Sequence, residues 1–533
     1  MLKVPDQGTS TWRPLRTPIF RNLLIASLVS DVGTFMQSVA AAWLMVSLHA
    51  GPLYVSLIQT ASALPFFVFA LPAGALGDIV DRRKLILFSE IWNAGAAMAL
   101  FAVAVTGHIS PLLLLILTFA FSAGDALESP AWQATLPEMV SQGDLAPAAA
   151  LNGIEFNLAR AIGPALGGFL IAIAGTSIAF LINAVSSFGV IFVFARWKRQ
   201  VRRPATPPET LSGATVAGIR YIRFSPALRA LGWRLGIVAF FGSALLALLP
   251  SVAHSAIESP IGYGILLGCF GLGGILGALV MQQVRARWSA ERVISSVTLL
   301  FGLMTIAAGI LHLFLALAVS MLMAGASAIL YVSLFNVMLL TQTPRWVQAR
   351  VLALGILVFQ GATAAGSALW GTVAIRTSIH FALICAGLGT IASTFLGLFL
   401  KLPVATVALT PWSHWRVPTT LAGNPAIDDD GPILVTVEYP VLPEHEAAFV
   451  QALYEYGRIR RRDGAYRWGV FRDLEKPNHY VELYLVNSWA EHLRQHDRST
   501  LADRSVEDRV FSYLTGTAIA RHLVYRPQDS DSH

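Results

Sequence analysis

The chain alternates between long apolar stretches and short polar connections. Twelve stretches are long enough to cross a hydrocarbon core of about 30 Å as helices. They cover residues 20–48, 53–77, 84–106, 110–135, 146–173, 176–196, 227–252, 260–284, 291–313, 315–341, 350–374 and 378–402. This pattern predicts an all-α polytopic membrane protein with twelve transmembrane helices.

Charge in the connections predicts the orientation of these helices. Lys and Arg gather in every second connection, at Arg82, Arg83 and Lys84, at Arg196 to Arg203, at Arg285, Arg287 and Arg292, and at Arg345 and Arg350. Loops rich in Lys and Arg stay on the cytoplasmic side. Because the number of spans is even, we expect a multi-pass inner-membrane protein with both termini in the cytoplasm.

The longest break among the spans divides them six and six. It is basic and contains Pro204, Pro207 and Pro208. We expect an N-terminal six-helix bundle at 1–196, a cytoplasmic linker at 197–226 and a C-terminal bundle at 227–402. Gly-Ala-Leu at 74–76 recurs at 277–279, and the glycine pattern at 163–168 recurs at 366–371, both at an offset of 203. Such repeats predict two halves with a substrate site between them near the midplane.

The composition changes after the last span. A linker at 403–432 with several prolines precedes a soluble domain at 433–527. Periodicity predicts strands at 433–439, 465–473, 479–487 and 517–525 and helices at 443–460 and 489–500. This βαββαβ order indicates a small α+β ferredoxin-like domain.

Composition excludes several classes of protein. The chain is 55% hydrophobic and 13% charged, far from an ordinary soluble protein. Its net charge of +7 comes from basic residues clustered in short loops, so we expect a lipid bilayer around the chain and no nucleic-acid partner. Cys269 and Cys385 lie in apolar runs and offer neither a disulfide framework nor a metal site. No phosphate-binding G-x-x-x-x-G-K-[ST] loop occurs, and we expect no cofactor.

The connection between the second and third spans carries a motif. Gly74-Ala-Leu-Gly-Asp78-Ile-Val-Asp-Arg82-Arg83-Lys resembles the cytoplasmic signature loop of the major facilitator superfamily. Ile79 and Asp81 depart from that pattern, which usually has Arg and Gly there. The resemblance implies a gating loop at Gly74, Asp78, Arg82 and Arg83. The alternative is a charge cluster that only sets topology.

A second motif lies in the fifth span. Gly163-Pro164-Ala-Leu-Gly167-Gly168 resembles the antiporter motif of exporters in this superfamily, although Ala159 stands where a leading Gly is common. A proline within a helix permits a bend, and glycines permit close helix packing. The resemblance favours export. The alternative is ordinary packing of small residues.

More of the chain resembles one branch of the superfamily, the secretion effectors related to enterobactin exporters. The resemblance rests on Asp31 to Gln37, Ala42 to Met45, Pro130 to Ala134, Ala149 to Asn152, Pro344 to Val351, and Gly366 to Gly371. It implies the major facilitator fold of six plus six helices and export of siderophore-like or drug-like small molecules. Segments 457–469 and 488–496 look like an extension of that branch related to antibiotic-biosynthesis monooxygenases, a dimeric α+β barrel. Dimerisation through this domain is therefore expected, whereas nothing in it marks a catalytic base, so we do not expect an enzyme.

Ionisable residues within spans are costly in lipid and are candidates for function. They are Asp31, Glu90, Asp125, Glu128, Glu155, Arg160 and Arg234. Asp31 is the first candidate for proton coupling, because burial favours the neutral form of a carboxyl group. Asp125, Glu128 and Glu155 follow. The alternative is that Asp31 is a structural ion-pair partner of Arg160 or Arg234.

Other span residues are candidates for the walls of a substrate cavity. These are Trp43, Trp132, Gln133, Arg160, Arg234, Asn336 and Gln360, for which helix packing is the alternative. In the soluble domain His492 and His496 have the i, i+4 spacing of metal ligands, but without a third ligand we expect solvated histidines and no metal.

Together these features predict a secondary active transporter that exports small molecules by alternating access as a proton antiporter. Two alternatives remain: a membrane-anchored enzyme whose soluble domain carries the chemistry, and a sensor or scaffold without transport.

Overall fold

The computed structural model describes residues 12–198, 211–400, 402, 409–412 and 431–525. Within these ranges it leaves out the side chains of residues 70, 71, 74–79, 142, 211, 212 and 214. The linker prolines Pro204, Pro207 and Pro208, and most of the linker at 403–432, lie outside the described residues.

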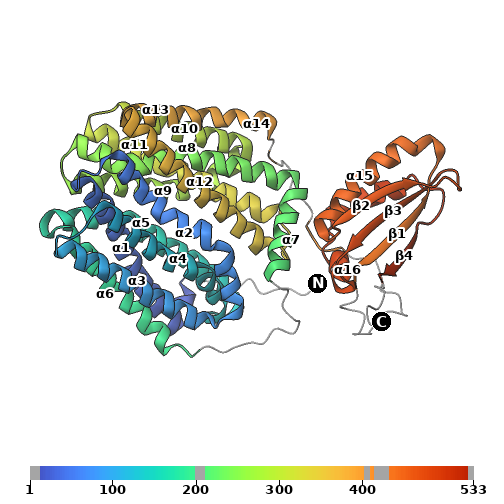
Figure 1. Cartoon of the computed structure of the whole chain (residues 1–533), viewed down its shortest axis with the longest axis horizontal. Helices are drawn as coiled ribbons and strands as arrows, with labels where there is room; N and C mark the ends of the chain where they lie inside the picture. The colour runs from blue at the N-terminus through green and yellow to red at the C-terminus, as the bar shows by residue number, and fades with distance from the viewer. Residues whose placement is uncertain (1–11, 199–210, 401, 403–408, 413–430, 526–533) are drawn as a thin grey trace, which may run out of the picture. The chain divides into compact units, whose positions relative to one another are not determined.

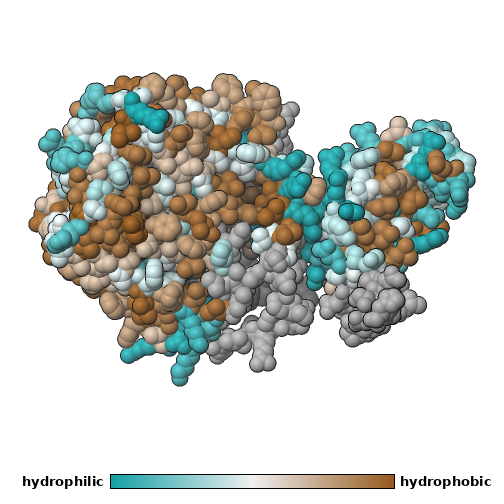
Figure 2. Space-filling view, viewed as in Figure 1, coloured by the Kyte–Doolittle hydropathy of each residue, from teal (hydrophilic) through white to brown (hydrophobic). Residues whose placement is uncertain are grey.

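Twelve helices in the described part of the chain are long and apolar enough to span a membrane. The first six are α1 (Pro18–Ser47), α2 (Gly51–Ile79), α3 (Arg82–Val105), α4 (Pro111–Met139), α5 (Leu145–Ala174) and α6 (Thr176–Arg196). The second six are α8 (Pro226–Ala256), α9 (Pro260–Arg287), α10 (Ala290–Ile310), α11 (Phe314–Thr341), α12 (Gln348–Arg376) and α13 (Ile379–Ala392), which α14 (Leu396–Phe399) extends. Figure 1 shows them as two bundles, and Figure 2 shows hydrophobic residues over much of the visible helical surface. The prediction of twelve spans is confirmed.

Helix starts follow local chemistry. Serine side chains cap α4 and α9, where Ser110 accepts a hydrogen bond from the Leu113 amide and Ser259 from the Ile261 amide. A proline follows each serine at the first helical position, where its missing N–H costs nothing. These serine-proline pairs set the starts of α4 and α9.

One helix was not expected. Residues Leu211–Phe224 form α7 within the segment predicted as a linker. The linker predicted at 197–226 therefore contains a helix in its second half. The sequence did not reveal this helix for two reasons. It is only 14 residues long, and it follows directly on Pro204, Pro207 and Pro208, which are typical of a linker.

The soluble domain forms a four-stranded antiparallel sheet of order β2-β3-β1-β4. Its strands are β1 (Ile433–Pro440), β2 (Arg467–Arg472), β3 (His479–Val486) and β4 (Ile519–Val524), and the long helix after β1 is α15 (Glu446–Asp463). Tyr439, Phe449 and Tyr484 fill the core between helix and sheet. This is the expected ferredoxin-like arrangement.

The predicted helix at 489–500 is wrong in its extent. The chain forms α16 (Trp489–Asp497) and then α17 (Leu501–Phe511). Thr500 interrupts the helix because it caps α17, where the Thr500 hydroxyl and amide both donate to Asp503. This capping box ends one helix and starts the next.

The described chain divides into two compact units. One comprises the membrane helices except for a few ends, at 1–208, 232–336 and 355–402. The other comprises residues 209–231, 337–354 and 403–533, so it joins α7 and parts of α8, α11 and α12 to the soluble domain. The two units are described separately below.

Candidate functional site

The two six-helix bundles meet along α5 and α9. A Cβ atom on Gly168 of α5 would lie 2.6 Å from the Pro260 carbonyl oxygen and 3.0 Å from the Gly264 Cα atom of α9. A Cβ atom on Gly264 would in turn lie 2.6 Å from the Pro164 carbonyl oxygen. Because backbone atoms oppose backbone atoms, neither position has room for a side chain.

The other glycines of the fifth-span motif face α1. A Cβ atom on Gly163 would lie 2.6 Å from the Phe35 Cβ atom, and one on Gly167 would lie 3.0 Å from the Met36 Cα atom. Helix α5 therefore uses Gly163 and Gly167 within its own bundle and Gly168 between bundles. The motif lets one helix pack closely on both sides.

Further contacts between the bundles surround this crossing. Trp43 of α1 contacts His254 of α8 edge-on at 5.6 Å between ring centroids and stacks on Tyr263 of α9 at 6.5 Å. The Thr60 hydroxyl of α2 donates to the Ala364 carbonyl oxygen of α12 at 3.1 Å. We call these contacts, with those of Gly168 and Gly264, the inter-bundle seam. Trp43, His254 and Tyr263 lie near helix ends whose connections lack Lys and Arg.

A cavity of about 180 Å³ lies beside the seam. Helices α1, α2, α5, α8 and α9 contribute to it, and its polar side chains include Ser38, Gln59, Arg160 and Tyr263. The Arg160 guanidinium lies 5.4 Å from the centroid of the Phe270 ring, which also lines the cavity. Of the predicted cavity residues, Arg160 lies here, and Trp43 adjoins it through Tyr263.

Sequence reasoning missed Gln59, Tyr263 and Phe270 as cavity residues. They are a single amide and two aromatic rings in long apolar helices, and nothing in their spacing separates them from packing residues. Only the crossing of the two bundles brings them together.

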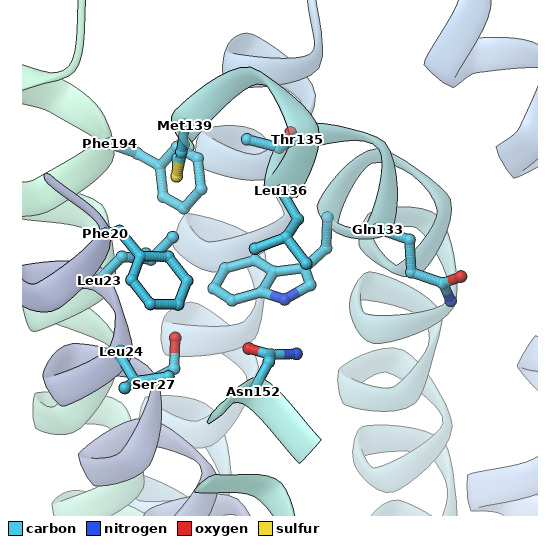
Figure 3. Close-up of a pocket in the computed structure, with 11 residues that line it drawn as sticks. Phe20, Leu23, Leu24, Ser27, Gln133, Thr135, Leu136, Met139, Asn152 and Phe194 are labelled. Carbon is cyan, nitrogen blue, oxygen red and sulfur yellow. The ribbon is translucent and has the colours of Figure 1, made fainter. Parts of the chain in front are cut away.

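Trp132 and Gln133 line a different cavity of about 260 Å³ inside the first bundle. Figure 3 shows Phe20, Leu23, Leu136 and Phe194 around it, with Ser27 and Asn152 as polar neighbours and Gln133 turned outward. The predicted cavity residues therefore fall into separate places. Asn336 and Gln360 line neither of these two cavities.

Five acidic residues gather in the first bundle. They are Asp31 on α1, Glu90 on α3, Asp125 and Glu128 on α4, and Glu155 on α5, and each interacts electrostatically with others of the group. We call them the acidic cluster. The Asp31 and Glu155 carboxyl groups are neighbours within this cluster. Two adjacent carboxyl groups can share one proton.

A buried amide supports the acidic cluster. The Asn93 amide nitrogen donates to an Asp125 carboxyl oxygen at 2.7 Å. Gly124 permits this approach, because a Cβ atom there would overlap the Asn93 side chain. Asn93 lies three residues after Glu90, a spacing that places both on one helix face, and this signal was available in the sequence.

The two span arginines do not pair with Asp31. Arg234 is buried and forms an ion pair with Glu291 at 2.8 Å. In the described part of the chain Arg160 forms no ion pair, and its described neighbour is the Phe270 ring. The alternative interpretation of Asp31 as the ion-pair partner of Arg160 or Arg234 therefore does not hold in this conformation.

The predicted gating loop is described in part. Gly74 lies in α2, and the side chain of Asp78 lies outside the described residues. Arg82 forms an ion pair with Glu138 at 2.8 Å. Arg83 donates to the carbonyl oxygens of Phe194 and Ala195 at 2.7 and 2.6 Å, at the C-terminal end of α6. These arginines connect α3 to α4 and to α6, all within the first bundle.

The histidines of the soluble domain are not solvated as expected. His492 is fully buried and packs against Trp489 and His522, with ring centroids 5.4 and 4.9 Å away. Burial, with the nearby charges of His522 and Arg460, lowers the pKa of His492 to about 3. No cluster suited to a metal ion occurs among the described residues.

A buried glutamate forms a second polar group in this domain. Glu482 has no exposed surface and accepts hydrogen bonds from the Tyr439 hydroxyl at 2.8 Å and the Trp468 indole at 2.7 Å. Arg460 lies 3.6 Å from it. This network satisfies a buried charge with partners from strand and helix.

These features define a polytopic membrane transporter with two six-helix bundles. The family model described as transmembrane secretion effector matches residues 9–527. The chain belongs to this family of major facilitator transporters, and it is a multi-pass inner-membrane protein.

Several known proteins are similar to it. The multidrug efflux pump Tap of Mycolicibacterium fortuitum is 25% identical over 396 residues, which cover 71% of this chain and 94% of Tap. The uncharacterized MFS-type transporter YfiS of Bacillus subtilis (strain 168) is 29% identical over 40% of this chain, and the match spans about half of YfiS, 53%. The enterobactin exporter EntS of Salmonella typhi is 26% identical over 50% of this chain and 64% of its own length.

Solved structures share the fold of the helical part. A bacterial homologue of the human lysosomal transporter Spinster, described in an inward-facing and unoccupied conformation, has a TM-score of 0.56 and 14% identity. The similarity covers 73% of this chain and 96% of the homologue.

Proposed function

We propose that this chain exports siderophore-like or drug-like small molecules by alternating access, with protons as the coupling ion. The observation that carries the proposal is the pair of neighbouring carboxyl groups of Asp31 and Glu155 inside the acidic cluster. The pair joins α1 to α5, and both helices also contribute to the inter-bundle seam.

The geometry supports coupling between the proton and the conformation. A shared proton is held while α1 and α5 keep the two carboxyl groups together. A movement of either helix that separates or hydrates the pair favours two charged carboxylates and releases the proton. A ligand can shift a two-state equilibrium only by binding the two states differently, and the carboxyl pair gives the proton that difference.

The relatives support export and a small-molecule substrate. Tap is named a multidrug efflux pump and EntS an enterobactin exporter. The cavity beside the seam has aromatic walls and one cation, Arg160. It suits an aromatic molecule that carries hydrogen-bond acceptors or negative charge. The membrane-anchored enzyme and the transport-dead scaffold are not favoured by these relatives.

Two further proposals concern topology and assembly. Both termini and the soluble domain lie in the cytoplasm, as the basic connections indicate. The soluble domain dimerises through the outer face of its sheet, where Phe471, Ile519 and Leu523 are each more than half exposed. Figure 2 shows hydrophobic residues on the visible face of this domain.

Transport and its coupling are tested with inverted vesicles from cells that lack their own efflux pumps. Uptake of a fluorescent lipophilic dye and of a catecholate siderophore is measured with and without a proton gradient. We expect gradient-driven uptake of at least one of them, and we expect Asp31→Asn and Glu155→Gln to abolish it while dye binding is retained. Glu258→Gln, an exposed acid between α8 and α9, is the matched control. Full gradient-driven uptake by both carboxyl variants would refute the coupling role.

A further inference from the structure

The soluble domain, α7 and the connection between α11 and α12 form one compact unit. Helix α7 is the regular element in the described part of the linker between the bundles, and the described connection between α11 and α12 runs from Gln342 to Val347. A Cβ atom on Gly218 of α7 would lie 3.0 Å from the Arg350 Cβ atom at the start of α12. Helix α7 therefore lies directly on α12.

One arginine of α7 holds the soluble domain. Arg220 donates to the carbonyl oxygens of Arg462 and Gly464, each at 3.3 Å, and to the Glu491 carboxylate at 3.0 Å. The two carbonyl groups belong to the C-terminal end of α15, where unpaired carbonyls favour a cation. Glu491 belongs to α16. A single side chain of the linker thus binds two helices of the domain.

This contact is mostly withdrawn from solvent. The side chains of Arg220 and Glu491 are each 13% exposed. Burial opposes the charge of Glu491, yet Arg498 and Arg220 hold the pKa of this carboxyl below its usual range. The pair is charged near neutral pH. Glu491 also pairs with Arg498 at 2.6 Å, so removal of Arg220 breaks the link to the linker and leaves the carboxylate with a counter-ion inside the domain.

Aromatic rings and arginines alternate around the ion pair. Tyr221 of α7 contacts Trp346 edge-on, with ring centroids 5.6 Å apart. From the domain, the Arg462 guanidinium lies 5.2 Å from the Tyr221 ring and the Arg498 guanidinium lies 4.4 Å from the Trp346 ring. Tyr, Trp and Arg dominate the binding energy of protein interfaces. The contact has the composition of a specific interface.

The length of the linker limits how far the first bundle can move from α7. Thirteen residues, 198–210, separate the end of α6 and its capping Trp197 from α7. Fully extended, they reach roughly 45 Å, at about 3.3–3.6 Å per residue. This reach is an upper limit on the distance from Trp197 to α7, so movement of the first bundle within that limit leaves the contact intact.

We propose that the soluble domain stays docked on α7 and the α11–α12 connection through Arg220 during the whole transport cycle, and moves with the C-terminal bundle. The first bundle, which carries the acidic cluster, is then the moving part. If the soluble domains of two protein copies dimerised, they would hold the two C-terminal bundles together while each N-terminal bundle moves.

A cross-linking experiment tests the docking without any transport assay. Phe224 of α7 and Arg461 of α15 are neighbours, with the guanidinium 5.2 Å from the ring. Both are changed to cysteine in full-length protein in membranes, with Cys269 and Cys385 replaced by alanine, and a short bismaleimide is added. We expect efficient cross-linking, an at least tenfold slower reaction after Arg220→Ala, and no change after Arg223→Ala, an exposed cation on the same helix.

Two measurements keep the result unambiguous. Amide exchange in β1 and β3 shows whether the domain is folded in each variant, and Trp346→Leu provides a second change on the other side of the contact. Cross-linking that is absent, or unaffected by both variants in a folded domain, would overturn the docking. Cross-linked protein that no longer transports, although the uncross-linked double-cysteine protein does, would overturn the claim that docking persists through the cycle.

Discussion

The glycine contact between α5 and α9 offers a direct test of alternating access. In Gly168→Ala the new Cβ atom lies 2.6 Å from the Pro260 carbonyl oxygen, about 0.8 Å short of the 3.4 Å at which ordinary contact begins. The opposing atoms belong to backbone that cannot rotate away. The helices must separate, and overpacking of this kind costs about 1–3 kcal/mol.

The alanine destabilises the conformation in which the inter-bundle seam is closed. It does not destabilise a conformation in which the seam is open. A difference of about 1–3 kcal/mol shifts the equilibrium between the two conformations roughly 5- to 150-fold toward the open seam. Gly153→Ala is the matched control on the same helix, because nothing lies within 4 Å of its added Cβ atom. Alanine also favours helix by about 1 kcal/mol over glycine, so a loss in Gly168→Ala is not caused by helix propensity.

The assay is labelling of a cysteine in the cavity. Ser38 lines the cavity beside the seam, and Ser38→Cys in a background without Cys269 and Cys385 is exposed to a membrane-impermeant maleimide outside intact cells. We expect labelling at least fivefold faster in Gly168→Ala than in Gly153→Ala. Equal labelling rates, with both proteins present at equal levels, would refute the assignment of the seam as a gate.

Three shorter predictions follow. Arg83→Ala removes two hydrogen bonds from the end of α6, so we expect a thermal midpoint several degrees lower in detergent, whereas Lys84→Ala, an exposed neighbour, should change it little. The folded domain keeps His492 neutral down to about pH 3, whereas an unfolded chain binds a proton below about pH 6.5, so His492 costs about 1.4 kcal/mol of stability per pH unit as the pH falls through that range. His492→Phe should therefore make the protease resistance of the domain fall less steeply between pH 7 and pH 5, and the lowered pKa of His522 accounts for a remaining slope. Reporter fusions after Leu402 and near Gly107 should lie on opposite sides of the membrane, and fusions on the same side would contradict the proposed topology.

The architecture was largely predictable because the bilayer imposes it. Each span has to satisfy its backbone internally and be about 20 apolar residues long, so length and hydropathy are enough to find it. Strand alternation likewise located β1 and β3, whose inward residues are buried along their whole length. Helix α7 escaped this reasoning because it is short, has basic residues, and is buried against α12 and the soluble domain, which sequence periodicity does not reveal.

The candidate site was predictable residue by residue but not as an arrangement. The cost of charge in lipid identified all five members of the acidic cluster, but not which of them are neighbours. The cavity candidates Trp132 and Arg160 looked equivalent in sequence and lie in different cavities. Helix packing decides which faces meet, and no local pattern encodes it.

The buried charged residues of the membrane helices are distributed unevenly between the two bundles. The acidic cluster lies wholly in the first bundle, Arg234 is neutralised by Glu291 in the second, and Arg160 projects from α5 toward the Phe270 ring of α9. Acidic and basic residues are therefore separated along α5, with Glu155 next to Asp31 and Arg160 at the cavity between the bundles. Because Glu155 and Arg160 belong to one rigid helix, a movement of α5 that breaks the carboxyl pair also displaces the cation that faces the cavity. Under the proposed function, proton release and a change in the substrate site would then both follow from one movement of α5. Coupling between them would need no additional chain of interacting residues.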